Sequence, residues 1–175
     1  MTRKSIRTGI ATYFGGSTLD ARNFYRPTPL QASGLSGVKA YYQYEFEDRD
    51  YVEGLTGTPI WGAIMCVDLP QMNENRHAIG GPGGGILNRP YGVNLFIWAR
   101  GTQQYMETAQ ASMDDLIEAT VARLRTDPTL GGLVLQAGEG PAGISISSGV
   151  PYGEPPTETR QDAVISFTAN TYPAG

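Results

Sequence analysis

The sequence predicts a domain of mixed helices and strands, in which one long helix is the main cover of the core. Alternate residues from Val93 to Ala99 are apolar on both faces, which indicates an interior strand covered on both sides. Directly after it, apolar residues recur at three- and four-residue steps, which predicts an amphipathic helix over residues 103–125. The apolar stripe of this helix contains Met106, Ala109, Met113, Leu116, Ile117, Thr120 and Leu124.

Both ends of the long helix carry recognisable signals. Thr102 is placed to cap the first turn, and Pro128 prevents the helix from continuing. Arg123 and Arg125 lie in the last turn, where positive charge interacts favourably with the helix dipole. A short helix is also predicted over residues 3–14, because an apolar stripe ends there at a pair of glycines.

Alternating apolar and polar residues elsewhere predict further strands. Residues 59–69 are nearly all apolar and indicate a second interior strand, whereas the other candidates have one polar face. Those candidates are residues 23–25, 38–46, 133–137, 144–147 and 163–170, of which 133–137 and 144–147 are predicted to pair around a turn. Residues 70–90 join the two interior strands, and so long a connection predicts a functional loop.

Length and composition restrict the function classes. A chain of 175 residues fits one domain, and its 23 glycines and 12 prolines indicate extensive ordered loops. A net charge of −4 and a pI near 5.0 argue against sequence-independent nucleic-acid binding. The single cysteine, Cys66, excludes an intramolecular disulfide, and neither a signal core nor a long apolar run is present. The sequence therefore predicts a soluble protein made in a reducing cytoplasm.

Candidate catalytic and ligand-binding residues are few. His77 is the only histidine, so neither a histidine metal cluster nor a usual zinc site is expected. The glycine loop at residues 80–85 lacks the Lys-Ser/Thr ending of a phosphate-binding loop, and the serines at 145–148 lack a nucleophile elbow. The acidic segment 45–50 lacks the spacing of a calcium loop. We predict no catalytic residue, no cofactor and no metal.

Several motifs, in this order, carry a family resemblance. They are a short N-terminal helix, SIRTGIATYF, an apolar strand, R-x-A-I-G-G-x-G-G-G at residues 76–85, the strand and long helix described above, L-R-T-D-P-T-L-G-G at 124–132, Q-A-G-E at 136–139 and a terminal strand. Over most of its length the chain resembles the tail terminator (tail completion, minor tail) proteins of long-tailed siphophages, particularly those that infect actinobacteria. Residues 33–58 align least well with that family.

The resemblance implies an α+β domain with helices packed on a mostly antiparallel sheet. It implies a non-enzymatic virion protein that assembles as a homohexameric ring, caps the tail tube and joins the tail to the head-side connector. The ring would stand at the head-proximal end of the tail after assembly in the host cytoplasm, and DNA would pass through its lumen without sequence-specific contacts. No membrane partner is implied.

The long connection is the predicted interface of this ring. A glycine-rich segment costs entropy to order, so its presence favours a role in contacts between subunits or with the tube. The hypothesis names eight residues: Arg76, His77, Gly80, Gly81, Gly83, Gly84, Arg89 and Tyr91. Three alternative functions are a head-completion or connector protein of the neck, a tail-tube subunit, and a small hydrolase or transferase that uses carboxylates and serines.

Overall fold

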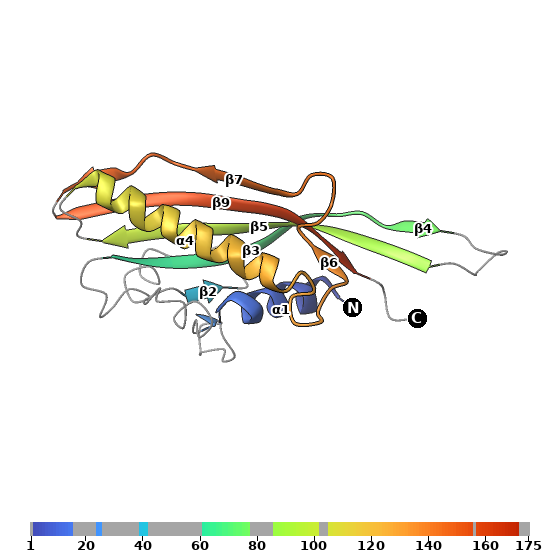
Figure 1. Cartoon of the computed structure of the whole chain (residues 1–175). Coiled ribbons are helices and arrows are strands. Elements are labelled where there is room, and N and C mark those ends of the chain that lie inside the picture. Colours follow the sequence, from blue (N-terminus) through green and yellow to red (C-terminus); the bar gives the residue numbers. More distant parts are fainter. Residues whose placement is uncertain are drawn as a thin grey trace.

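The computed structural model describes residues 2–15, 24–25, 39–41, 61–77, 86–101, 105–155 and 157–171, which form two helices and nine strands (Figure 1). The helices are α1 (Arg3–Gly15) and α4 (Met106–Thr126). The strands are β1 (Phe24–Tyr25), β2 (Lys39–Tyr41), β3 (Trp61–Met72), β4 (Asn75–His77), β5 (Ile86–Gly101), β6 (Gln136–Ala137), β7 (Ile144–Ser148), β8 (Tyr152–Glu154) and β9 (Glu158–Thr171).

The strands form one sheet with β5 near its centre. The order of neighbours is β1-β2-β3-β5-β9, and β6, β7 and β8 follow one another along the outer side of β9. Every pairing is antiparallel except that of β2 with β3. In the middle of the sheet Leu95 lies between Val67 of β3 and Ile165 of β9. The class is therefore α+β with a mostly antiparallel sheet.

The core lies between one face of this sheet and the two helices. Alternate residues of β3, β5 and β9 point into it, because side chains of a strand alternate between faces. The alternation predicted for Ala163, Ile165, Phe167 and Ala169 is confirmed. Ile6, Ile10 and Phe14 of α1 enter the same cluster of buried residues as Met113, Leu116 and Leu124 of α4.

The predicted stripe of the long helix is confirmed with one exchange. Met106 is only half-buried, whereas Val121 is buried with the remaining stripe residues. The helix begins at Met106, later than predicted, with Tyr105 at the N-cap position and no side-chain cap. Thr102, the predicted cap, lies outside the described residues. At the other end the helix stops at Thr126, as Pro128 leads one to expect.

The second face of β5 is covered less than predicted. Asn94, Phe96 and Trp98 remain half-exposed, although they alternate with fully buried neighbours. The rings of Phe96 and Trp98 stack with their centroids 5.5 Å apart, and the Ser166 hydroxyl donates to Asn94 Oδ1 at 2.8 Å. These side chains therefore contact neighbours along the face while remaining partly exposed.

The predicted loop at residues 70–90 is wrong where strands occupy it, at residues 70–72, 75–77 and 86–90, whereas residues 78–85 lie outside the described residues. Strand β3 continues through a β-bulge between Asp68 and Gln71, and β5 already begins at Ile86. Pro70 lies in that bulge, where a residue without an N–H is tolerated in a strand. Beyond the bulge, Asn75–His77 pair with Ile86–Asn88 as a two-stranded extension that projects past the end of β9 (Figure 1). We call this extension the arm.

Two other local predictions differ from the structure. Residues 133–137 and 144–147 were expected to pair with each other, but β6 and β7 both pair with β9. The glycine- and proline-rich segment 149–157, where no strand was predicted, contains β8, which forms a hairpin with the start of β9. Within residues 33–58 the structure describes only Lys39–Tyr41, so the predicted acidic loop lies outside the described residues.

Candidate interaction surfaces

Metal-ligating side chains do not gather in the part of the chain that the structure describes. Among these residues no three His, Cys, Asp or Glu side chains stand close enough to hold a metal ion. Ser145, Ser147 and Ser148 are exposed on β7, as their sequence context predicted. Neither described helix has the length and apolar character needed to cross a membrane.

Cys66 is buried in β3. Its side chain has no exposure, and burial, reinforced by the nearby charge of Asp68, raises the pKa of the thiol to about 12. A thiol in this state is protonated at neutral pH and is a poor nucleophile. Cys66 is therefore a buried and unreactive side chain.

Asp127 organises the turn that follows α4. Its carboxylate accepts hydrogen bonds from the Thr129 hydroxyl at 2.6 Å, the Thr129 amide at 2.9 Å and the Gly131 amide at 2.7 Å. These bonds, with that of the Thr129 side chain first, lower the pKa of Asp127 below its ordinary value. The turn also carries Leu130, which adopts a positive φ of 52° and is buried. The role of Asp127 is therefore structural.

The start of β9 carries a second perturbed carboxyl group. Burial raises the pKa of Asp162, and this effect is opposed by the hydrogen bond from the Tyr152 hydroxyl at 3.5 Å and by the charge of Arg160. Tyr152 is itself half-exposed on β8. This hydrogen bond adds to the backbone pairing of β8 with β9.

The arm contains two of the eight predicted interface residues. Arg76 and His77 lie in β4, and Arg89 stands at the base of the arm, where its Nε is 2.9 Å from Glu74 Oε2. Tyr91 is only 1% exposed and belongs to the core, so the structure removes it from the interface hypothesis. The predicted glycines lie outside the described residues: Gly80, Gly81, Gly83 and Gly84.

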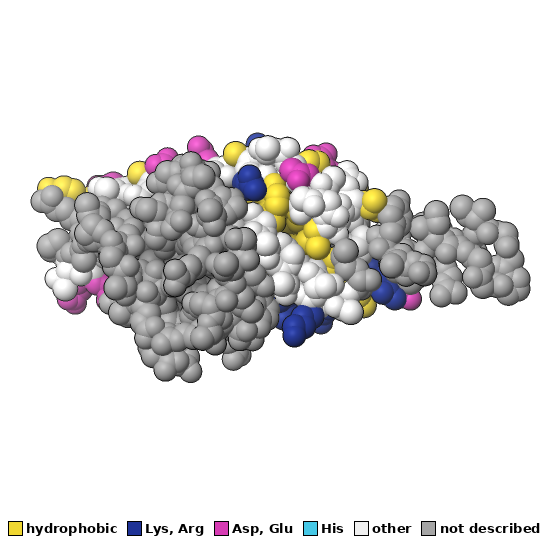
Figure 2. All heavy atoms as spheres, turned by 90° about the horizontal axis from the view of Figure 1, so that it is seen from below, with side chains coloured by type: hydrophobic (Ala, Val, Ile, Leu, Met, Phe, Trp, Pro, Cys, Tyr) yellow, Lys and Arg dark blue, Asp and Glu magenta, His cyan; other side chains and the backbone are white. Residues whose placement is uncertain are grey.

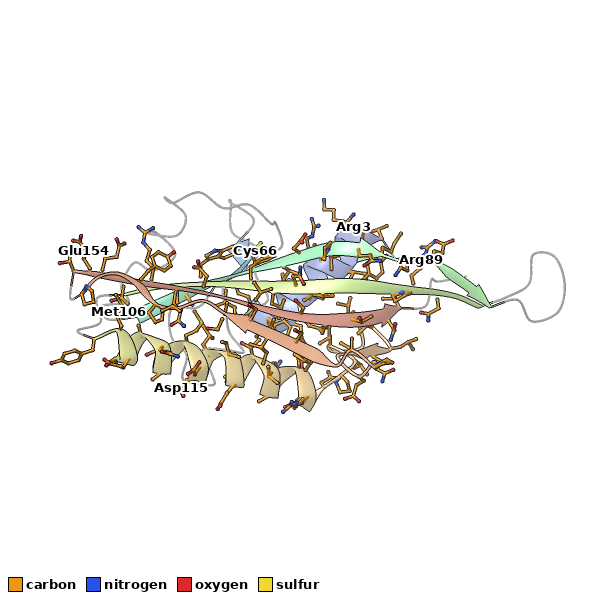
Figure 3. The ribbon with its side chains drawn as sticks, turned by 90° about the horizontal axis from the view of Figure 1, so that it is seen from above. Arg3, Cys66, Arg89, Met106, Asp115 and Glu154 are labelled. Atoms are coloured by element: carbon orange, nitrogen blue, oxygen red, sulfur yellow. The ribbon has the colours of Figure 1, made fainter. Side chains whose placement is uncertain are left out.

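The outer side of β9, where β7 lies, carries a surface that the sequence did not reveal. Here a groove of about 620 Å³ opens between α4 and Ile146 of β7. Its floor is apolar and includes Ile117, Val121 and Ile146, while Asp115, Glu118 and Arg125 supply charge at the rim. Asp115 projects outward from α4 in Figure 3. Ile146 is 49% exposed although it is a large aliphatic residue.

The backbone of β7 is unpaired on its outer side among the described residues, where β7 pairs only with β9. The Gly149 amide donates to the Asp162 carbonyl oxygen at 2.8 Å, and this bond shows which amides of β7 point towards β9. Backbone groups of an antiparallel strand alternate in direction, so the amides of Ile146 and Ser148 point away from β9. The strand contains neither a charged residue nor a proline, the residues that usually prevent an exposed edge from pairing with another chain.

Two sequence signals could have indicated this surface. The segment ISISS is short and uncharged, and on α4 the small residues Ala119 and Ala122 stand beside the buried stripe. Neither signal shows which strand lies beside the helix, because that depends on the pairing of β7 with β9. Searches of protein-family models and of curated proteins find no match to this chain.

Proposed function

We propose that this chain is a structural virion protein whose surfaces, rather than a reactive pocket, perform its task. In this proposal it forms a closed ring of identical subunits, with six as the expected number, at the head-proximal end of a phage tail. The ring caps the tail tube, ends its polymerisation and presents a surface to the connector of the head. DNA passes through the lumen, which fits an acidic chain that does not grip the phosphate backbone.

The observation that carries this proposal is the pair of unequal surfaces on one small domain. A ring of identical subunits uses head-to-tail contacts, so each subunit needs two different and complementary surfaces. The arm projects from one end of the sheet, and the α4–β7 groove with its unpaired strand edge lies along one side. The resemblance of the sequence motifs to tail terminator proteins adds the identity of the tube and connector as partners.

The body of the domain has a supporting role in the proposal. We infer that α4 is the principal cover of the sheet and that α1 completes this cover, so that both surfaces are held on a rigid base. The Tyr13 hydroxyl donates to the Arg123 carbonyl oxygen at 2.8 Å and thereby joins the ends of the two helices. Arg123 also stands over the Tyr13 ring at 4.6 Å, a cation–π geometry that reinforces this joint.

Electron microscopy of particles assembled without this protein tests the function. Overlong or uncapped tails are the expected result for a tail terminator. Tail-less heads that hold or leak DNA would instead assign the chain to the neck, as a head-completion or connector protein. Normal virions would contradict both assignments.

A biochemical measurement tests the same proposal with purified components. Light scattering of the protein, alone and after addition of tail tubes, should give a ring mass and a capped complex. A chain that neither associates nor binds tubes would contradict the proposed function.

A further inference from the structure

The arm and the α4–β7 groove are complementary in their backbone requirements. On the arm, β4 and residues 86–88 of β5 pair only with each other among the described residues, so each of these short strands has one unpaired side. A two-stranded ribbon of this kind is marginal in water without a further strand or a packing surface. Strand β7 offers such an edge, with the outward amides of Ile146 and Ser148 and the apolar groove beside them.

The charges of the two surfaces are also complementary. Residues 75–88 contain one arginine, one histidine and no acidic residue. The groove has two carboxylates at its rim, from Asp115 and Glu118, against the single guanidinium of Arg125. Figure 2 shows both acidic and basic side chains along the upper edge of the molecule. Opposite charge at an interface favours one docking orientation over others.

A single copy does not bring these two surfaces together. The arm extends beyond the end of β9 along the strand direction, whereas β7 flanks the middle of β9 at Ala163–Phe167 (Figure 1). We therefore infer that the α4–β7 groove is the socket for the arm of a second copy, which adds a strand to the edge of β7. This inference deepens the proposed function, on which it rests, by assigning the two halves of the subunit contact.

The contact is head-to-tail and differs from a two-fold pairing of β7 with β7. In strand addition, main-chain hydrogen bonds supply affinity and pockets for alternate side chains supply specificity. The outward amides of Ile146 and Ser148 would supply the first, and the floor of the groove at Ile117 and Val121 would supply the second. Since arm and socket lie on different sides of the molecule, each bound copy leaves one arm and one socket free to continue the assembly.

Two variants of the full chain test this assignment separately. Ile146→Lys places a charged residue on the edge strand and blocks the socket, while the arm is unchanged. The second variant replaces residues 76–87 with Asn-Gly, which shortens the arm and leaves the socket unchanged. Because Asn75 and Asn88 face each other in register, a two-residue turn can close this hairpin. Val150→Lys is the matched control, since Val150 is 84% exposed and stands outside β7 and the groove lining.

Light scattering over a concentration series gives the readout, with circular dichroism as the test of folding. The wild type and Val150→Lys should associate equally, and each of the two test variants alone should associate at least about tenfold more weakly, or by about 1.4 kcal/mol. An equimolar mixture of Ile146→Lys with the shortened-arm variant should form a dimer that does not grow, because one intact arm meets one intact socket.

Several results would overturn the inference. A shortened-arm variant that still dimerises would show a two-fold edge contact, and a mixture that stays monomeric while the wild type associates would show a different interface. A wild type that remains monomeric at every concentration would remove the contact altogether. If Ile146→Lys is unfolded, Ser148→Pro replaces it, because the Ser148 amide points outward and makes no bond to β9.

Experiments on assembled particles distinguish a failure of the socket from a failure of the proposed function. Particles that contain Ile146→Lys and still have tails of normal length would leave the function standing and reject the socket. Association as described above, together with normal tails in particles that lack the protein, would retain the socket and reject the tail-terminator function.

Discussion

The two sides of β9 differ in what they contribute to the molecule. Towards the centre, β9 pairs with β5 along nearly its whole length, from Arg89 paired with Thr171 to Gly101 paired with Thr159. Towards the outside, it pairs with three short strands separated by turns. Ile165 and its outer partner Ile146 show the contrast, because the first has no exposure and the second is 49% exposed. The inner side supplies stability, and the outer side presents a surface.

The sharpest test of this contrast substitutes an isoleucine of β9, Ile165, and its partner on the outer strand β7, Ile146. Ile165→Ala should lower the free energy of unfolding by about 4 kcal/mol, because a buried cavity adds to the lost transfer energy. Ile146→Ala should lower it by less than about 1 kcal/mol, since the side chain is already half in water. Urea unfolding of both variants provides the measurement. Equal losses would contradict the assignment of stability to the inner side.

The β8–β9 hairpin shows that one part of the outer side is nevertheless tightly built. Gly153 has a φ of 120°, and a Cβ at this position would stand 2.5 Å from the Glu158 carbonyl oxygen. Gly153→Ala should therefore lower the free energy of unfolding by about 2 kcal/mol or more. Gly132→Ala is the control, because its φ is 80° but its Cβ would meet open space, so that only the backbone term of about 1 kcal/mol remains. Thermal unfolding distinguishes the two, and a smaller loss at Gly153 would contradict the clash.

The turn after α4 should show an acid-dependent stability. The pKa of Asp127 is lowered in the folded state, so its contribution is present above the ordinary value of 3.8 and disappears as the pH falls through the folded pKa. Asp127→Ala should therefore be less stable than the wild type at pH 7, and the difference should shrink in acid below about pH 4. Urea midpoints measured across this range provide the test. A difference that does not change with pH would assign the effect to packing instead.

The smallest effect is expected at the Tyr152–Asp162 pair. The pKa of Asp162 is raised in the folded state, so the associated stability is present below 3.8 and is lost as the pH rises through the folded pKa. Tyr152→Phe removes the hydrogen bond that opposes this rise, and it should raise the pKa of Asp162 further while lowering stability by about 0.5 kcal/mol. Carboxyl NMR titration measures the shift. An unchanged Asp162 pKa would show that the bond at 3.5 Å does not form in solution.

The comparison of the two sides also explains which predictions from the sequence succeeded. Residues that face the core repeat with the period of their own element, so the stripe of α4 and the alternation of β9 could be read directly. The end of α4 was also predicted, because Pro128 acts through local geometry. The start of α4 was not, since a single residue at Thr102 is a weak signal beside a helix whose observed N-cap, Tyr105, makes no side-chain bond.

The candidate surfaces were predicted less well, for a related reason. Proline and glycine near residues 70–90 suggested a loop, but the bulge at Pro70 and the pairing of Asn75–His77 with Ile86–Asn88 extend the sheet instead. Tyr91 was predicted to be an interface residue. Its position in β5 directs its side chain into the core, where it is buried. The form of this segment was therefore predicted wrongly wherever strands occupy it, at residues 70–72, 75–77 and 86–90.

The sequence by itself determined the two helices, apart from the start of α4, and the side of each helix and of β9 that faces the core, because periodicity records the surroundings of each side chain locally. Only the tertiary structure decided that β6 and β7 pair with β9 rather than with each other, and that β7 therefore lies beside α4 with an unpaired edge. Strand pairing joins residues far apart in the chain, and many partners satisfy the same local pattern. Which partner is chosen depends on the packing of the whole sheet.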